Sequence, residues 1–307
     1  MTNPTAAIGI DIGGSSAKGG LVTPDGRIIA QTSVATADHD ERETVLANYE
    51  QLIHDLLTQA GRLNLPVTGI GVGVPGYLDE SGRAMIYGNV RCLEGFPLGD
   101  HFAHRFGLPV QLDNDANCAA LAEYYWGGGE GCDRLLVATV GSGIGVAVMI
   151  NGKLLRYTYG TTGELGSIVV DACGGKSAFL GGQGGLESVA SSRAMIDAAA
   201  TLQPRPNNVA ELADSARSQE PAAAIIRQAG WWLGIGIASW AAIFAPKRVL
   251  IGGGVAACGD LYFNAVRKSA FDAVPPYYKP GLTIAAADLG NQAGFMGAAS
   301  LILLKPE

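Results

Sequence analysis

The sequence predicts an α/β protein built from two related lobes, and three observations support this. Residues 8–22 and residues 136–150 are alike, since each is an apolar strand, a glycine-rich turn and a second apolar strand. Each copy ends in a tight polar turn, Asp-Gly at residues 25–26 and Asn-Gly at residues 151–152. These dipeptides are strong hairpin signals because both turn residues must reach positive φ. Helix and strand patterns then alternate after each copy, as in an α/β fold.

In the first half, a third strand over residues 28–34 completes an antiparallel meander. Apolar side chains at helical spacing predict a helix over residues 41–59. Short apolar runs predict strands over residues 67–74 and 108–112. The polar residues after the second run predict a helix over residues 114–126 that begins at an Asn or Asp cap.

The second half repeats this order. Its predicted elements are a third meander strand over residues 154–157, a long helix over 221–244, a strand over 248–251, a helix over 261–273, a strand over 282–286 and a closing helix over 292–304. We expect the lobe boundary near residue 115. On this division residues 1–115 form a small N-terminal lobe joined by the C-terminal helix, 291–307, and residues 116–290 form a large lobe.

The composition narrows the class of protein. The chain has 307 residues, of which 48% are hydrophobic and 16% charged, so it can bury a core in each lobe. A net charge of −7 argues against a nucleic-acid-binding surface. The five cysteines are scattered without a C-x-x-C pair, which disfavours a disulfide framework or a zinc knuckle and fits a reducing compartment.

Nothing in the sequence predicts export or membrane insertion. The first seven residues lack the pattern of a signal peptide. The most apolar stretch, residues 230–245, is too short and too rich in glycine to span a membrane, and it predicts a buried helix. We therefore expect a cytoplasmic protein with neither a membrane nor a nucleic-acid partner.

The two glycine-rich turns indicate phosphate binding. A tight turn of glycines exposes backbone N–H groups without a Cβ to block a phosphate oxygen. Either turn alone could be only a turn, but the duplication, Asp11 at the first turn and Ser142 at the second favour phosphate. No Walker A motif is present. Weak matches to a dinucleotide-binding motif occur at residues 71–76 and 252–257, and they leave an NAD-dependent enzyme open as a minor alternative.

Four motifs carry a resemblance to a known family. They are the runs at residues 11–15, 140–145, 252–255 and 113–123. With these motifs the chain resembles the ROK family of bacterial sugar kinases and repressors, especially its glucokinase-like members, from about residue 8 to residue 303. The resemblance implies two actin-like ATPase (ribonuclease H-like) lobes with a central cleft. It also implies ATP-dependent phosphorylation of a hexose hydroxyl, with ATP and Mg²⁺ as cofactors and a homodimer as the assembly.

The resemblance also implies the site residues. The matching ATP-binding positions are Asp11, Gly13, Gly14, Ser15, Gly141, Ser142, Gly143, Gly253 and Gly254. The matching sugar-binding positions are Gly76, Asn89, Asn114, Asp115, Glu164 and Glu187. Among these, Asp115 matches the catalytic base, and its place at a strand-to-helix junction suits a carboxylate because of the helix dipole.

Each of these side chains also has an ordinary structural interpretation. We expect Asp11 to hold Mg²⁺, through water or directly, because Mg²⁺ takes few protein carboxylates, but Asp11 could instead only form a turn. Asp115 or Asn114 could simply cap the helix that follows. Glu164 and Glu187 are flanked by glycine and could be solvated, and Asn89 could be a turn residue.

The chain departs from the family at its structural zinc site. In the family, one His and three Cys bind the zinc. Here the corresponding positions hold Ser167, Ala178, Leu180 and Gly185. Because zinc needs about four N or S ligands, we expect no zinc site. The missing His also contacts sugar in the family, so whether Ser167 replaces it stays open.

Several functions remain open beside the kinase. Glucose is the first candidate for the sugar substrate, and fructose, mannose and N-acetylmannosamine are alternatives. A repressor is disfavoured because only seven residues precede the first predicted strand, which is too few for a DNA-binding domain. A sugar-sensing relative without catalysis is disfavoured because Asp115 is retained.

Overall fold

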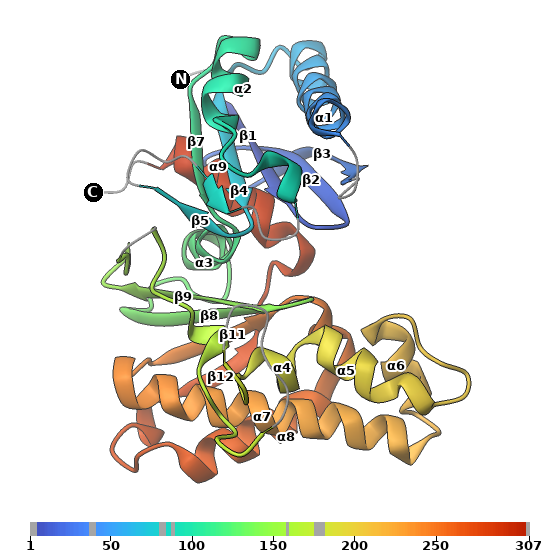
Figure 1. Cartoon of the computed structure of the whole chain (residues 1–307). Coiled ribbons are helices and arrows are strands. Elements are labelled where there is room, and N and C mark those ends of the chain that lie inside the picture. The colour runs from blue at the N-terminus through green and yellow to red at the C-terminus, as the bar shows by residue number, and fades with distance from the viewer. Residues whose placement is uncertain are drawn as a thin grey trace. The chain divides into compact units, whose positions relative to one another are not determined.

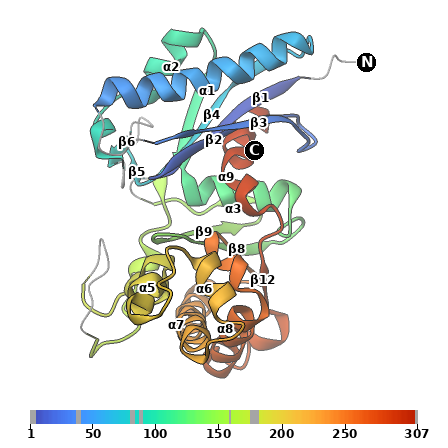
Figure 2. The same ribbon diagram turned by 90° about the vertical axis from the view of Figure 1, so that its right-hand side faces the viewer.

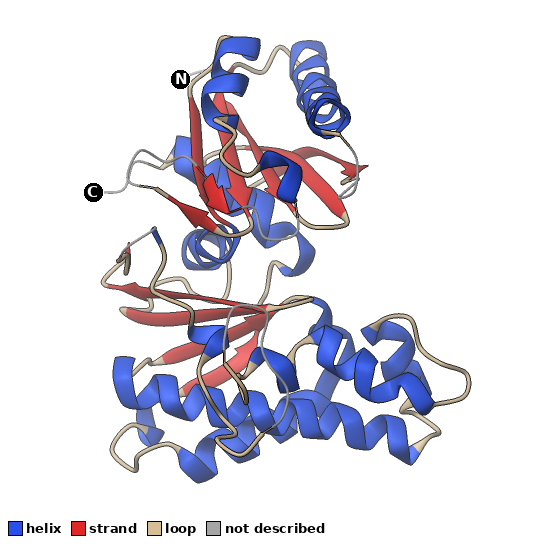
Figure 3. Ribbon diagram, in the orientation of Figure 1, coloured by secondary structure: helices blue, strands red, loops and turns tan. Residues whose placement is uncertain are grey.

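The structure is a computed structural model that describes residues 5–36, 41–79, 84–86, 90–157, 160–174 and 182–304. Contacts divide the chain into two compact units (Figures 1 and 3). The first unit consists of residues 1–130, 153–163 and 291–307, and the second of residues 131–152 and 164–290. We describe each unit by itself.

The first unit is built on a five-stranded sheet in the order β3-β2-β1-β4-β7. Its strands are β1 (Ala6–Ile12), β2 (Ser16–Val22), β3 (Ile28–Ala35), β4 (Val67–Val74) and β7 (Val110–Asn114). The first three form the predicted antiparallel meander, and β4 and β7 add to it in parallel. A short pair, β5 (Tyr77–Leu78) and β6 (Ala84–Ile86), follows β4.

Helices cover both faces of this sheet, as Figure 2 shows. On one face lie α1 (Arg42–Arg62) and α2 (Leu98–Phe106), and on the other lie α3 (Asp115–Trp126) and α9 (Ala293–Leu303). Side chains alternate along β1, so Ile8 and Ile10 pack in the core with the buried face of α1, whereas Gly9 faces α9.

The last helix lies unusually close to the sheet. A Cβ on Gly9 would stand 1.8 Å from the Phe295 carbonyl oxygen, and a Cβ on Gly71 would stand 1.7 Å from that of Ala298. A Cβ on Gly297 would stand 1.6 Å from the Cys118 carbonyl oxygen of α3. Glycine at these three positions therefore lets α9 pack backbone to backbone against β1, β4 and α3.

The second unit contains four strands of the other five-stranded sheet, whose order is β10-β9-β8-β11-β12, because β10 falls within residues 153–163 of the first unit. The strands of this sheet are β8 (Arg134–Val140), β9 (Ile144–Ile150), β10 (Lys153–Leu154), β11 (Arg248–Gly252) and β12 (Thr283–Ala286). As in the first unit, an antiparallel hairpin, β8 with β9, is extended by parallel strands, β11 and β12. This supports the internal duplication.

Five α-helices accompany this sheet in the described part of the chain. They are α4 (Glu187–Ala190), α5 (Ser192–Ala198), α6 (Val209–Ser215), α7 (Glu220–Phe244) and α8 (Gly259–Ala273). Helices α7 and α8 pack closely, since a Cβ on Gly234 would stand 1.8 Å from Ser269 Oγ. Trp240 of α7 is fully buried, and its indole N–H donates to the Leu165 carbonyl oxygen at 3.2 Å.

The described elements differ from the sequence-based expectation in several places. The short elements β5, β6, α4, α5 and α6 were not predicted. The predicted strand at residues 154–157 ends at Leu154, because Arg156 turns to an ion pair with Asp113. Helix α2 was not predicted, although Leu98 and Phe102 have helical spacing and Gly107 ends the helix with φ +66°. The expected lobe boundary near residue 115 precedes α3, whereas contacts keep α3 in the first unit because it packs on α9.

Among the helices of the described residues, none is both long and apolar enough to cross a lipid bilayer.

Candidate active site

The junction between β7 and α3 carries the predicted catalytic residue. Asn114 is the N-cap of α3: its Oδ1 accepts hydrogen bonds from the backbone N–H of Ala116 at 3.0 Å and of Asn117 at 3.3 Å. This satisfies two N–H groups that an α-helix leaves open at its start. Asn114, and not Asp115, is therefore the cap of α3, and Asp115 occupies the first helical position.

Asp115 is half-buried, and its Oδ1 accepts the Ala116 N–H at 2.8 Å. A carboxylate in the first turn of a helix is stabilised by the helix dipole. This position suits a group that must stay ionised in order to accept a proton.

Asn114 also connects the junction to the turn after β4. Its Nδ2 donates to the Gly76 carbonyl oxygen at 2.9 Å, which leaves the second N–H of the amide for another acceptor. Gly76 has φ +104°, a conformation that favours glycine. The structure thus brings together three of the predicted sugar-binding residues, Gly76, Asn114 and Asp115, in the first unit.

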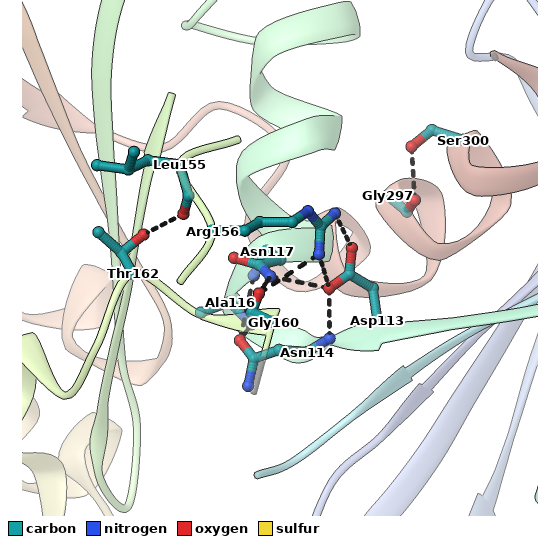
Figure 4. A network of polar contacts seen from close by, with 10 residues as sticks. All are labelled: Asp113, Asn114, Ala116, Asn117, Leu155, Arg156, Gly160, Thr162, Gly297 and Ser300. Atoms are coloured by element: carbon teal, nitrogen blue, oxygen red, sulfur yellow. Dashed lines mark hydrogen bonds and ion pairs between the residues drawn. The ribbon is translucent and has the colours of Figure 1, made fainter. Parts of the chain in front are cut away.

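A polar network includes residues of this junction and extends to Arg156 and Gly160 (Figure 4). Asp113 is buried, and its carboxylate accepts from the Asn114 backbone N–H at 2.7 Å and from Asn117 Nδ2 at 2.8 Å. Arg156 donates to both carboxylate oxygens of Asp113, at 2.9 and 2.5 Å. Burial lowers the pKa of Arg156, but the bonds and charge of Asp113 outweigh it and raise that pKa. Neither Asp113 nor Arg156 was predicted as a site residue.

Three carboxylates of the first unit influence one thiol. Burial raises the pKa of Cys118 well above its ordinary value, and the charges of Asp113, Asp11 and Asp115 raise it further. Cys118 is a buried residue of α3, and a Cβ on Gly73 of β4 would stand 3.2 Å from its sulfur. The predicted base, Asp115, and the predicted magnesium residue, Asp11, therefore both lie close enough to Cys118 for their charges to raise its pKa.

Asp11 stands near the end of β1, opposite Lys18 of β2 in the sheet register. Burial raises the pKa of Asp11, while the charge of Lys18 lowers it in part. A Cβ on Gly294 would stand 2.4 Å from the Asp11 carboxyl group, so this group lies against the first turn of α9.

The first glycine-rich turn follows Asp11 and joins β1 to β2. The Gly13 N–H donates to the Ser16 carbonyl oxygen at 3.0 Å, which closes the turn over Gly14 and Ser15. The Ser15 carbonyl oxygen accepts the Thr36 N–H at 3.0 Å, and the side chain of Ser15 is exposed.

The second glycine-rich turn, Gly141 to Gly143, joins β8 to β9 in the second unit. The Gly141 N–H donates to the Gly143 carbonyl oxygen at 2.9 Å across Ser142. Glu187, at the start of α4, accepts the Ile144 N–H on its Oε2 at 2.9 Å. A Cβ on Gly143 would stand 2.5 Å from the same oxygen. A predicted sugar-binding carboxylate thus supports a predicted phosphate-binding turn.

The turn after β11 meets this second glycine-rich turn. Gly253 has φ +89°, and a Cβ there would stand 2.3 Å from the Val140 carbonyl oxygen. The Ser192 N–H donates to the Gly141 carbonyl oxygen at 2.8 Å, and a Cβ on Gly254 would stand 3.7 Å from Ser192 Oγ. The predicted nucleotide-binding glycines of this unit therefore lie side by side.

Ser192 was not predicted from the sequence. In the part of the chain that the structure describes, two buried side-chain oxygens lack a hydrogen-bond partner, Ser192 Oγ and Tyr262 Oη. A buried hydroxyl normally has a hydrogen-bond partner, so the Ser192 hydroxyl beside the glycine turns is an exception in this unit.

Glu164 is exposed and precedes the short 3₁₀ helix Leu165–Ser167, in which Ser167 is half-buried. The segment that carries zinc ligands in the family is held here by backbone bonds in its described part. The N–H groups of Val170 and Asp171 donate to the Gly184 carbonyl oxygen at 2.9 and 3.2 Å.

Three predicted positions lie outside the described residues, Asn89 and the zinc-site positions Ala178 and Leu180. Over the described residues, no group of three or more His, Cys, Asp or Glu side chains could hold a metal ion. The expectation of no zinc site stays a prediction.

Comparisons with known proteins identify the family of the chain. A family model described as the ROK family matches residues 7–305. A glucokinase of Halalkalibacterium halodurans is 30% identical over 96% of this chain and 94% of its own length. The solved structure of a ROK family glucokinase from Streptomyces griseus, in complex with glucose and AMPPNP, is 31% identical with a TM-score of 0.83. It covers 97% of this chain and 99% of its own.

The similarity extends to a regulator. The structure of a ROK family transcriptional regulator, a homologue of the E. coli MLC protein, is 26% identical with a TM-score of 0.84 and covers 97% of this chain and 77% of the regulator. The predicted family and fold class are confirmed. Since the family model spans nearly the whole sequence, the chain belongs to the ROK family, whose sugar kinases have the two-lobed actin-like ATPase fold.

Proposed function

We propose that this protein is an ATP-dependent sugar kinase that transfers the γ-phosphoryl group of ATP to a hexose hydroxyl, with glucose as the first candidate. The observation that carries the proposal is Asp115 at the first position of α3, with Asn114 as the cap. The similarity to glucokinases along nearly the whole chain supports the activity and the sugar. The retained Asp115 favours catalysis over sugar sensing alone.

Asp115 acts as the general base. Phosphoryl transfer needs the sugar hydroxyl aimed at the γ-phosphorus and a carboxylate that accepts its proton as the bond forms. The helix dipole favours a carboxylate at the position of Asp115, and the remaining N–H of the Asn114 amide orients the sugar. Gly76 leaves room for the sugar because it has no Cβ.

The glycine turns bind the nucleotide. In the first unit these residues are Asp11, Gly13, Gly14 and Ser15. In the second unit they are Gly141, Ser142, Gly143, Gly253 and Gly254, to which the structure adds Ser192. Backbone N–H groups in such turns donate to phosphate oxygens, and the unsatisfied Ser192 hydroxyl is a further donor.

Asp11 fits a magnesium site. Mg²⁺ is held by one or two carboxylates together with water and substrate phosphates, so a single carboxylate beside a phosphate turn suffices. Burial of Asp11 disfavours its charge, which a bound cation would offset. When bound, Mg²⁺ supplies charge neutralisation on the phosphates.

Glu164 and Glu187 accept hydrogen bonds from sugar hydroxyls, and Asn89 donates or accepts another. Glu187 uses Oε2 for the Ile144 N–H, and a carboxylate oxygen can accept more than one bond, so the group can serve turn and sugar together. Which hexose fits best depends on these acceptors.

A coupled assay of ADP release tests the function. Glucose, fructose, mannose and N-acetylmannosamine are each supplied with Mg²⁺ and ATP, and reactions without sugar serve as controls. We expect glucose-dependent ADP release. If the protein binds hexoses but turns none of them over, a sugar-sensing role without catalysis would be favoured. The similarity to a ROK family transcriptional regulator supports that alternative.

The homodimer also remains a proposal. Trp231 and Ile243 of α7 are 42% and 67% exposed, and apolar side chains of this size are common at subunit interfaces. Sedimentation of the purified protein over a range of concentrations decides between monomer and dimer.

A further inference from the structure

Arg156 makes a two-pronged contact with the residue that precedes the candidate sugar site. Its Nη1 and Nη2 donate to Oδ1 and Oδ2 of Asp113 at 2.9 and 2.5 Å (Figure 4). The side chain of Asp113 is 2% exposed, and that of Arg156 is 41% exposed. A planar guanidinium that donates two parallel bonds to a buried carboxylate fixes the orientation of the two groups as well as their separation.

The same carboxylate holds the start of α3. Asp113 Oδ1 accepts the Asn114 backbone N–H and the Asn117 side-chain amide, so its partners flank Asp115 in the sequence. The Gly160 carbonyl oxygen accepts from Asn117 Nδ2 at 2.9 Å and from Arg156 Nη1 at 3.4 Å. Arg156, through its side chain, and Gly160, through its carbonyl oxygen, are therefore both bonded to the start of the helix.

We propose that Arg156 is a positioning residue for sugar phosphorylation: through Asp113 it fixes the orientation of Asn114 and Asp115. This inference rests on the proposed kinase function. Arg156 acts on the reaction through another residue, since both of its Nη atoms donate to Asp113. A small rotation of the β7–α3 junction would move the base relative to the hydroxyl, and catalysis is sensitive to displacements of this size.

An ordinary buried ion pair is the competing interpretation. Such pairs add little net stability, although removing one partner is costly because it leaves an uncompensated charge. Arg156→Lys separates the two interpretations, because lysine keeps the positive charge beside Asp113 but cannot donate two parallel bonds. Arg105→Ala is the matched control, since Arg105 pairs with Glu50 in the same unit, at 3.0 Å, away from the junction.

The experiment compares kcat, the KM for glucose and the affinity for AMPPNP without sugar. We expect kcat to fall about tenfold in Arg156→Lys and about a hundredfold in Arg156→Ala, while AMPPNP affinity stays within about twofold. Millimolar guanidinium should restore part of kcat in Arg156→Ala. Hydrogen exchange at the Ala116 and Asn117 amides, which donate to Asn114, should become faster in both variants. Arg105→Ala should leave kcat and these two exchange rates unchanged.

An Arg156→Lys protein with wild-type kcat and wild-type exchange at these two amides would overturn the inference. So would an equal loss of kcat and AMPPNP affinity, because that pattern marks general unfolding. If the wild-type protein phosphorylates no sugar, the proposed function fails on that result alone. The exchange rates then still decide whether Arg156 holds the start of α3.

Discussion

At the scale of single residues, three consecutive residues at the β7–α3 junction have different structural roles. Asn114 caps α3, Asp115 takes the first helical position, and Asp113 turns inward to Arg156. The cap of α3 and the buried ion pair are therefore formed by the flanking residues, while Asp115 accepts the Ala116 N–H. An isosteric change at Asp115 tests its chemical role without removing the cap or the ion pair.

The Asp115→Asn substitution keeps the shape of the side chain and removes the base. We expect turnover of glucose to fall by about a thousandfold, the middle of the range for loss of a general base. Binding of glucose and AMPPNP should remain, because the cap and the glycine turns are untouched. Calorimetric titration with each ligand, beside the ADP assay, measures both effects. A kcat near that of the wild type would refute the assignment of the base.

Ser192 gives a prediction in which stability and binding change in opposite directions. Its buried hydroxyl has no hydrogen-bond partner among the described residues, so Ser192→Ala should leave the free protein as stable or more stable by up to about 1 kcal/mol. The same change should raise the KM for ATP by roughly two- to tenfold, the effect of one lost hydrogen bond.

Ser191→Ala is the matched control for Ser192→Ala. Ser191 caps α5 by accepting the Ala194 N–H at 3.1 Å, so its loss should cost about 1 kcal/mol of stability with little effect on the KM for ATP. Urea unfolding and initial rates measure the two quantities. A Ser192→Ala protein that is clearly destabilised and keeps a normal KM would show the hydroxyl to be structural.

At the scale of elements, ion pairs between helices make stability depend on pH. Glu50 of α1 contacts His101 and Arg105 of α2, at 2.8 and 3.0 Å. Burial alone would raise the pKa of Glu50, but the hydrogen bonds and charges of Arg105 and His101 outweigh it and lower that pKa. A lowered carboxyl pKa contributes stability above the unfolded-state pKa, about 4.3, and this contribution is lost as pH falls through the folded-state value.

The Glu50→Gln substitution should therefore destabilise the protein at pH 7 by up to about 1 kcal/mol, since the pair is partly exposed. The difference from the wild type should shrink as the pH falls below about 4. Urea unfolding at several pH values measures it. A difference that is constant from pH 7 to pH 3 would mean that packing, and not charge, links α1 to α2.

Elements with strong local signals were predictable from the sequence, and long-range partners were not. The hairpins followed from their Asp-Gly and Asn-Gly turns, and β4 followed from an apolar run with the predicted bounds. The motif around Asp115 indicated the β7–α3 junction. The pairing of Arg156 with Asp113 had no local signal, because its two members are 43 positions apart and a lone arginine is usually solvated. The same holds for Ser192, whose neighbours come from other segments.

At the scale of the whole molecule, the chain passes between its two units after residues 130, 152, 163 and 290. The first unit therefore contains segments from both ends of the sequence. Helix α9 lies on β1 and β4 at a distance that only glycine at positions 9 and 71 permits, so it is an integral part of the first unit. The first unit cannot be complete until residues 291–307 have been synthesised.

A chain that ends at Gly290 should consequently lose the first unit and keep the second. We expect amides of β1 and β4 to lose their protection from hydrogen exchange, because removing α9 exposes the sheet face that Gly9 and Gly71 line. Amides of β8 and β11, which belong to the second unit, serve as the internal control. Glucose binding should disappear, since Asp115 begins a helix that packs on α9 through Gly297. If β1 and β4 stay protected and glucose still binds, α9 is an accessory helix, and the first unit is complete within residues 1–163.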